Sequence, residues 1–112
     1  MKSILIGDAA AIKKAKSGKF MFKLPEGREE GFAVYFKGKF YAYINRCKHV
    51  SIPLDFGDND FFTDDGKFLL CKNHGALYKP DTGECVAGPC SGAYLDPLPV
   101  EIKSNKLYCL VK

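Results

Sequence analysis

The chain carries two short motifs in which a histidine follows closely after a cysteine. The first is Cys47-Lys48-His49 and the second is Cys71-Lys72-Asn73-His74. They hold both of the histidines in the 112-residue chain. One intervening residue in the first motif, and a two-residue turn in the second, let each thiolate and its imidazole project from one loop tip. Two such loops facing each other form a clamp for one small inorganic group.

The ligand types narrow the identity of that group. Thiolates favour zinc or iron-sulfur clusters, whereas imidazole suits several first-row metals. Structural zinc sites usually space their ligands as C-x(2 to 4)-C and H-x(3 to 5)-H, and a mixed C-x-H pair is not the common pattern. The motifs therefore favour an iron-sulfur cluster, with a zinc-binding interaction module as the alternative.

The order C-x-H … C-x-x-H resembles the Rieske family, whose [2Fe-2S] cluster has two cysteines on one iron and two histidines on the other. The resemblance continues through Gly75-Ala76-Leu77-Tyr78 and a Thr82-Gly83 corner. It also includes Ala87-Gly88-Pro89, which matches the proline-containing loop that covers the cluster in that family. Three matches in the right order are more specific than one short motif.

This resemblance implies one [2Fe-2S] cluster per chain. Cys47 and Cys71 would bind the inner iron, and His49 and His74 the outer, more exposed iron. The chain departs from most Rieske ferredoxins because 71 − 49 − 1 = 21 residues separate the two motifs, which is several more than usual. We assign the excess to the acidic and aromatic segment 55–62.

Four residues are expected to surround the cluster and tune its potential: Ala76, Tyr78, Gly88 and Pro89. Hydrogen bonds to cluster sulfurs stabilise the added electron and raise the potential. High-potential members of the family place a serine where Ala76 stands and a tyrosine where Tyr78 stands. Without the serine hydroxyl, we expect a potential in the lower part of the Rieske range of about −150 to +300 mV. A half-buried strand aromatic is the alternative reading of Tyr78.

The residues flanking the ligands are expected to form a collar where a partner docks: Lys48, Ile52, Pro53 and Lys72. Short apolar residues permit close approach, and the two lysines suit acidic groups on a partner. Ordinary loop packing is the alternative for each of them.

Three further cysteines lie outside the motifs. Cys85 and Cys90 are expected to be small buried residues, because cysteine is among the most buried residue types. A disulfide across the Gly88-Pro89 turn, or a secondary redox pair, is the alternative. Cys109 fits the core of the last strand.

Composition predicts one globular domain over residues 1–112. Its 112 residues leave no room for a separate catalytic domain. The chain is 46% hydrophobic and 27% charged, which is ordinary for a globular protein. It contains no targeting signal and no long apolar run, so we expect a cytoplasmic protein that does not enter a membrane. The net charge of +4 comes from scattered lysines. It favours steering toward an acidic redox partner over binding of nucleic acid.

The pattern of short apolar alternations and turns predicts an all-β protein with the Rieske fold. About ten short antiparallel strands would form a base sandwich, with a small cluster-binding lobe made of the two ligand loops. Asp8 is expected to cap a short helix over 8–16 that ends at Gly18, and residues 25–30 to form an exposed loop. The expected strands and hairpins are 3–6, 19–24, 31–37 with 40–45 around Gly38, 61–62 with 67–71, 77–79 with 84–87, and 100–103 with 106–111.

These observations predict a one-electron carrier that takes electrons from a reductase and passes them to an oxygenase or similar terminal enzyme. The chain is expected to be a monomer and not itself an enzyme. It offers no nucleophile with a partnering base, and a mononuclear iron site would need the histidines already used. A redox-sensing or regulatory subunit of a larger enzyme is the alternative from another class.

Overall fold

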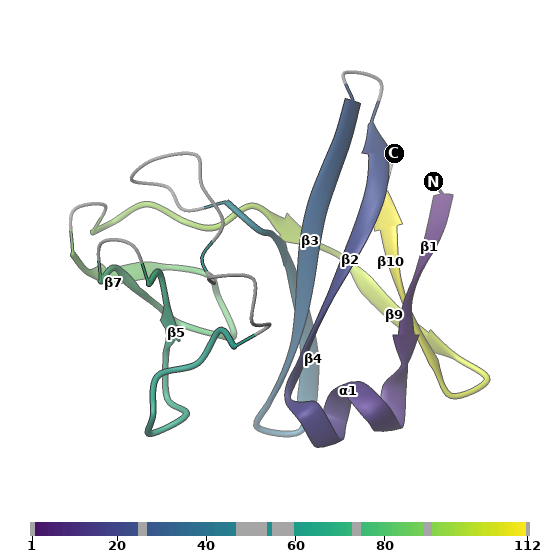
Figure 1. Ribbon diagram of the computed structural model, residues 1–112, viewed down its shortest axis with the longest axis horizontal. Helices are drawn as coiled ribbons and strands as arrows, with labels where there is room; N and C mark the ends of the chain where they lie inside the picture. The colour runs from purple at the N-terminus through teal and green to yellow at the C-terminus, as the bar shows by residue number, and fades with distance from the viewer. Residues whose placement is uncertain are drawn as a thin grey trace. The chain divides into compact units, whose positions relative to one another are not determined.

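The computed structural model describes residues 2–24, 27–46, 54, 60–72, 75–88 and 91–111. Within them the chain forms ten strands and one helix (Figure 1). Their bounds are β1 Lys2–Asp8, α1 Ala9–Ala15, β2 Ser17–Leu24, β3 Gly27–Phe36, β4 Lys39–Ile44, β5 Leu69–Leu70, β6 Leu77–Tyr78, β7 Cys85–Ala87, β8 Pro97–Leu98, β9 Val100–Lys103 and β10 Lys106–Val111.

The chain divides into two compact units. The first, the base unit, combines Met1–Ile44 with Pro97–Lys112, and the second, the loop unit, is Asn45–Asp96. Both expected ligand motifs belong to the loop unit.

Two antiparallel sheets make up the base unit, with strand orders β1-β10-β9 and β2-β3-β4-β8. The pairing of β2 with β3 is unbroken from Ser17 opposite Val34 to Leu24 opposite Gly27. Strands β3 and β4 meet at Lys37-Gly38, where both residues have positive φ (49° and 84°), as a two-residue hairpin turn requires. The hairpin expected around Gly38 is confirmed.

Two apolar clusters form the core of this unit. One joins strands of both sheets through the buried residues Phe20, Phe22 and Cys109, with β1, β4, β8 and β9 contributing half-buried side chains. The other brings helix α1 onto the sheets, and its buried members are Ile12, Ala33, Ala42 and Leu107. The base unit is therefore a sandwich with an apolar core of its own.

The helix begins where expected and ends earlier. The Asp8 carboxylate accepts a hydrogen bond from the Ala11 N–H at 3.1 Å, which confirms Asp8 as the N-cap. The end expected at Gly18 is wrong, because Lys16 takes the left-handed conformation (φ 71°) and Gly18 already lies in β2. The left-handed conformation has a small energetic cost for a lysine, so the sequence pattern does not predict it at this position.

The exposed loop expected over 25–30 is wrong for residues 27–30. Strand β3 begins at Gly27, so Arg28, Glu29 and Glu30 continue the ladder opposite β2. Backbone pairing along a long hairpin outweighs the low strand propensity of these charged residues.

Short pairings hold the loop unit together. Its sheet has the order β5-β6-β7, and an isolated bridge joins Phe62 to Leu69. The chain after β7 then folds back along it, with Cys85 N–H donating to Ala93 C=O at 2.7 Å and Gly92 N–H to Cys85 C=O at 2.9 Å. The hairpin expected around 77–87 is present with strands of two and three residues. In the hairpin expected around 61–71 only β5 is a strand, and residues 61–62 contribute a single bridge.

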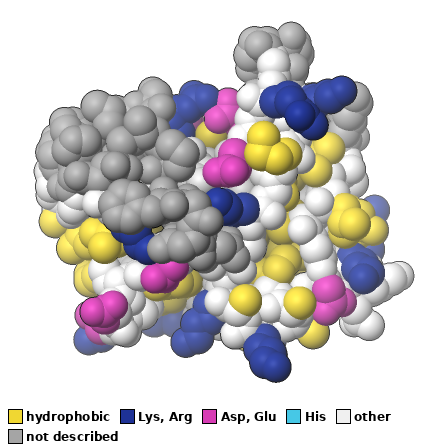
Figure 2. Space-filling model, in the orientation of Figure 1, with side chains coloured by type: hydrophobic (Ala, Val, Ile, Leu, Met, Phe, Trp, Pro, Cys, Tyr) yellow, Lys and Arg dark blue, Asp and Glu magenta, His cyan; other side chains and the backbone are white. Residues whose placement is uncertain are grey.

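The described residues contain no helix with the length and apolar character needed to cross a membrane. Lysine and arginine side chains stand at several separate places on the visible face, with aspartate and glutamate among them (Figure 2).

Candidate metal centre

The second ligand loop leaves β5 at Cys71 and returns into β6. Cys71 is completely buried. Its N–H donates to Ala76 C=O at 2.9 Å, and its C=O accepts from Gly75 N–H at 2.8 Å. These two backbone bonds close the loop at Cys71. His74 lies outside the described residues.

The first ligand motif also lies outside the described residues, and so do Lys48, Ile52 and Pro53. The residues on either side of that segment are described, and the Asn45 carboxamide oxygen accepts from Leu54 N–H at 2.9 Å. Leu54 is completely buried, and its C=O accepts from Lys72 N–H at 2.9 Å. Leu54, which follows the segment of the first ligand motif, is thus hydrogen-bonded to Lys72, the residue after Cys71.

A third segment packs directly against the second ligand loop at Gly88. A Cβ placed on Gly88 would lie 2.8 Å from the Ala76 Cα, so a larger residue would not fit. Gly88 also has a φ of 99°, and its C=O accepts from both the N–H (3.3 Å) and the hydroxyl (3.1 Å) of Ser91. Pro89 and Cys90 lie outside the described residues.

The interior next to these loops is closed to solvent. Ala76 and Tyr78 are completely buried, so Tyr78 is not the half-buried aromatic considered as an alternative. Whether its hydroxyl bonds a cluster sulfur stays a prediction. Cys85 is buried as expected, and its thiol lies 3.3 Å from the Ala87 carbonyl oxygen. The disulfide to Cys90 falls outside the described residues.

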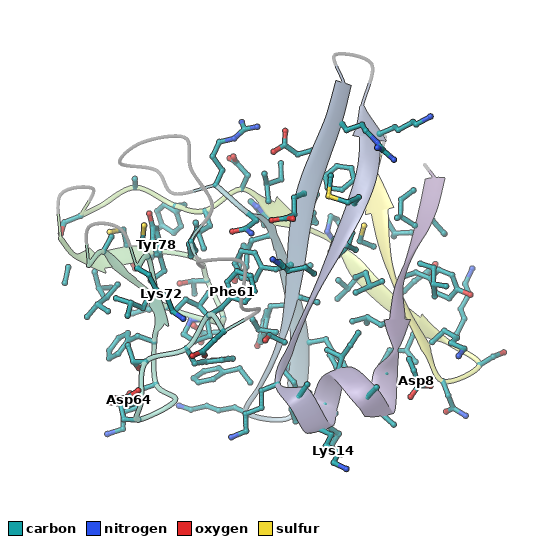
Figure 3. All side chains as sticks on the ribbon, in the orientation of Figure 1. Asp8, Lys14, Phe61, Asp64, Lys72 and Tyr78 are labelled. Carbon is teal, nitrogen blue, oxygen red and sulfur yellow. The ribbon has the colours of Figure 1, made fainter. Side chains whose placement is uncertain are left out.

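Lys72 is held in an ion pair that the sequence did not reveal. Its Nζ lies 3.5 Å from Asp60 Oδ2, and its side chain is only 16% exposed. Figure 3 shows Lys72, Phe61 and Tyr78 in the loop unit. The docking role expected for Lys72 stays a prediction, now with an internal partner for its charge. The sequence showed only that Asp60 carries a charge opposite to that of Lys72, because twelve positions of chain separate the two residues.

Another acidic residue of the same unit, Asp65, stabilises a turn. Asp65 accepts hydrogen bonds from the Thr63 hydroxyl and from Lys67 N–H. These bonds to its charged form, first that of Thr63, hold the pKa of the Asp65 carboxyl below its usual value.

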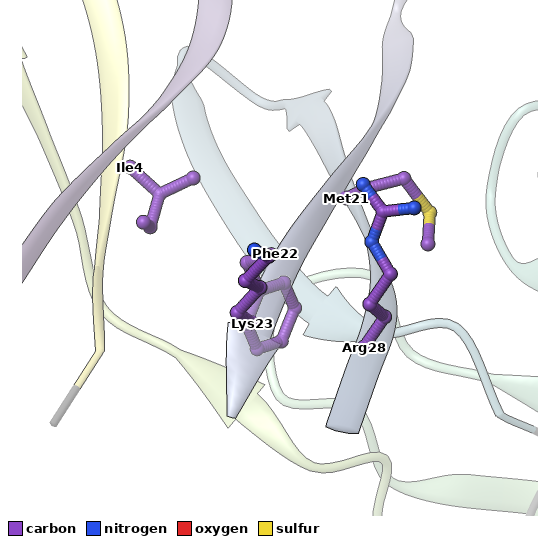
Figure 4. Close-up of a pocket in the computed structure, with 5 residues that line it drawn as sticks. All are labelled: Ile4, Met21, Phe22, Lys23 and Arg28. Carbon is purple, nitrogen blue, oxygen red and sulfur yellow. The ribbon is translucent and has the colours of Figure 1, made fainter. Parts of the chain in front are cut away.

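A shallow pocket of about 340 Å³ opens on the base unit, where β1 and β2 diverge (Figure 4). None of the residues expected at the site lines it. Its lining residues are Ile4, Met21, Phe22, Lys23 and Arg28.

A family model described as "Rieske [2Fe-2S] domain" matches residues 6–106. The chain belongs to the Rieske family. Its cofactor is therefore one [2Fe-2S] cluster, and the donor set fits that group. A buried thiol at Cys71, in a loop closed by backbone bonds and followed by a histidine, supplies the shielded half of such a site.

Solved structures show the same fold. The ferredoxin of carbazole 1,9a-dioxygenase from Nocardioides aromaticivorans IC177 is 20% identical, with a TM-score of 0.74 and all of both chains covered. A ferredoxin of Sphingomonas yanoikuyae B1 is 20% identical, with a TM-score of 0.72 and 99% of each chain covered. A chain in a complex of reduced oxygenase and oxidized ferredoxin of carbazole 1,9a-dioxygenase is 21% identical, with a TM-score of 0.73, covering 96% of this chain and 91% of that one. No curated protein sequence matches significantly. The all-β Rieske fold expected from the sequence is confirmed.

Proposed function

We propose that this Rieske domain is a one-electron carrier that accepts electrons from a reductase and delivers them to an oxygenase or similar terminal enzyme. The observation that carries the proposal is the Rieske match over residues 6–106, which includes both ligand motifs. Likeness along the whole length to the ferredoxin of a carbazole dioxygenase, and to a ferredoxin of Sphingomonas yanoikuyae B1, supports it. The same match supports a single domain over residues 1–112.

The proposed ligands are Cys47 and Cys71 on the inner iron and His49 and His74 on the outer iron. When bound, the cluster supplies reversible uptake of one electron without transfer of atoms. Complete burial of Cys71 supports the assignment of the cysteines to the inner, water-shielded side. The hydrogen bond from Lys72 N–H to Leu54 C=O supports it too, since it ties together the segments that carry the two motifs.

Residues around the loops would set the redox properties. Ala76 and Tyr78 exclude water because both are fully buried, and Gly88 lets the segment bearing Pro89 pack on Ala76. With no serine hydroxyl at position 76, we expect a potential in the lower part of the range of about −150 to +300 mV.

We propose that partners dock at the collar of Lys48, Ile52, Pro53 and Lys72. The complex of oxygenase and ferredoxin in a carbazole dioxygenase system supports an oxygenase as the acceptor. A reductase as donor, a monomeric state, a cytoplasmic location and the absence of nucleic-acid binding stay predictions.

Anaerobic purification followed by iron, acid-labile sulfide and zinc analysis tests the cofactor. We expect iron and sulfide in equal amounts and a visible absorption spectrum that bleaches on reduction. Stopped-flow mixing of the reduced protein with an oxidised Rieske oxygenase then tests the carrier role, with rapid re-oxidation as the expected result. A colourless zinc protein would overturn the cluster. A loaded protein whose electrons never reach an oxygenase, but whose binding to an enzyme depends on its oxidation state, would overturn the carrier role in favour of a sensor.

A further inference from the structure

Lys72 is fixed at both its backbone and its side chain. It follows Cys71 directly, so the Cα atoms of the two residues are about 3.8 Å apart. Its N–H is bonded to Leu54 C=O at 2.9 Å. Its ammonium lies 3.5 Å from the carboxylate of Asp60, with the lysine side chain 16% exposed and the aspartate side chain 65% exposed. The pair therefore places two opposite charges next to the second ligand loop, one of them largely out of water.

A second ion pair in the same unit provides a contrast. Lys79 and Glu84 approach to 3.9 Å, and their side chains are 49% and 36% exposed. Such exposed charges are screened by water and salt. A largely buried ammonium interacts more strongly with its surroundings, because the effective dielectric constant around it is lower.

Any charge near a redox centre changes the energy of the electron added to it. A cation stabilises the reduced form and raises the potential, and an anion does the opposite. Two adjacent opposite charges largely cancel. Whether the centre experiences the lysine charge thus depends on the carboxylate that accompanies it.

We propose that Asp60 is a positioning residue that holds the Lys72 ammonium beside the second ligand loop and offsets its charge, so that the lysine cation does not raise the reduction potential of the centre. The inference rests on the proposed ligation by Cys71 and His74. In each reduction one electron enters from an external reductant and no bond is made or broken. Asp60 lies within the acidic and aromatic segment 55–62.

The proposal predicts shifts of opposite sign for the two halves of the pair. Asp60→Asn removes one negative charge beside the lysine cation, so the midpoint potential should rise. Lys72→Gln leaves the aspartate anion, so the potential should fall. Each change should alter the ratio of reduced to oxidised protein at a fixed potential by about two- to tenfold. The double variant should return close to the wild-type value.

Anaerobic redox titrations monitored by electron paramagnetic resonance measure these shifts. Asp60→Glu should restore the wild-type potential. Asp64→Asn is the matched control, because it removes the same charge from an exposed turn that lies away from Lys72 in Figure 3. Lys79→Gln and Glu84→Gln are the controls for an exposed ion pair. All of these controls should leave the potential nearly unchanged.

A purely structural role for the pair would move both single variants in the same direction, and that result would overturn the proposal. So would an Asp64→Asn shift as large as that of Asp60→Asn. Iron and sulfide content separates the two levels of inference. A wild-type protein without iron and sulfide contradicts the proposed function, whereas loaded variants with unchanged potentials contradict the charge pair alone.

Discussion

The two units of this chain are held together in different ways. Strands β2 and β3 of the base unit have 8 and 10 residues, with continuous ladders and two apolar clusters between them and their neighbours. In the loop unit β5 and β6 have 2 residues each and β7 has 3. That unit is held by single hydrogen bonds, by close backbone contacts and by completely buried side chains such as Phe61, Leu69 and Tyr78. We infer that the base unit is stable by itself, whereas the loop unit depends on its metal centre for much of its order.

Removing the Cys71 thiol tests this contrast most severely. In Cys71→Ala we expect complete loss of the cluster, because one ligand of the inner iron is missing. Cys109→Ala in β10 is the matched control, since both cysteines are completely buried. It should keep the cluster and lower the stability of the base unit by about 1 kcal/mol.

Iron analysis and amide hydrogen exchange read out the result. In Cys71→Ala the amides of Cys71 and Lys72 should lose protection, while those of β3 and β4 keep theirs. A retained cluster would contradict the ligand assignment. Loss of protection across β3 and β4 as well would contradict the independence of the base unit.

A methyl group on Gly88 tests how tightly the loop unit is packed. In Gly88→Ala the new Cβ would meet the Ala76 Cα at 2.8 Å, at a residue whose φ is 99°. We expect a loss of about 2–4 kcal/mol and release of the cluster at a lower temperature. Gly92→Ala is the control, because Gly92 has a similar φ of 92° and open space where its Cβ would lie.

The control isolates the backbone strain, which we expect to cost about 1 kcal/mol. Thermal loss of visible absorbance, followed beside far-ultraviolet circular dichroism, distinguishes the two units. Equal losses of stability in the two variants would show that the contact with Ala76 contributes nothing to the cost of Gly88→Ala.

The features that were predicted correctly from the sequence are those that neighbouring residues determine. The Gly38 turn, the Asp8 cap and the paired Cys-His motifs each depend on residues within a few positions of one another. The elements that were missed depend on distant partners. Strand β8 contains Pro97 and pairs with Ala42 and Tyr43 of β4. Proline argues against a strand except at a sheet edge, and β8 is at the edge.

The candidate site divides in the same way. Its ligand motifs are local and were visible in the sequence. The Asp60–Lys72 pair and the contact of Gly88 with Ala76 join separate segments, and no short-range pattern encodes them. The left-handed Lys16 was missed because glycine two positions later offered the commoner way to end a helix.

Alkaline pH should weaken the base unit through Cys109. Burial raises the pKa of this thiol from its ordinary value of 9.0 to about 11. The unfolded chain therefore loses the proton first, so this part of the stability is fully present below pH 9 and is lost as the pH rises toward about 11. Denaturant unfolding at a series of pH values should show a smaller alkaline loss in Cys109→Ala than in wild type. Equal losses would assign the effect to other groups.

The smallest effect should come from the cap of α1. In Asp8→Ala the Ala11 N–H loses its 3.1 Å acceptor, which should cost the base unit about 1 kcal/mol. Asp8→Asn keeps a capping oxygen and removes only the charge, which lies 3.8 Å from the half-exposed ammonium of Lys106. That variant should lose less than about 0.5 kcal/mol. Equal losses in the two variants would assign the stabilisation to the ion pair. In both variants the reduction potential should stay at the wild-type value. A changed potential would show that loss of helical structure in the base unit alters the metal centre, which would contradict the inferred independence of the two units.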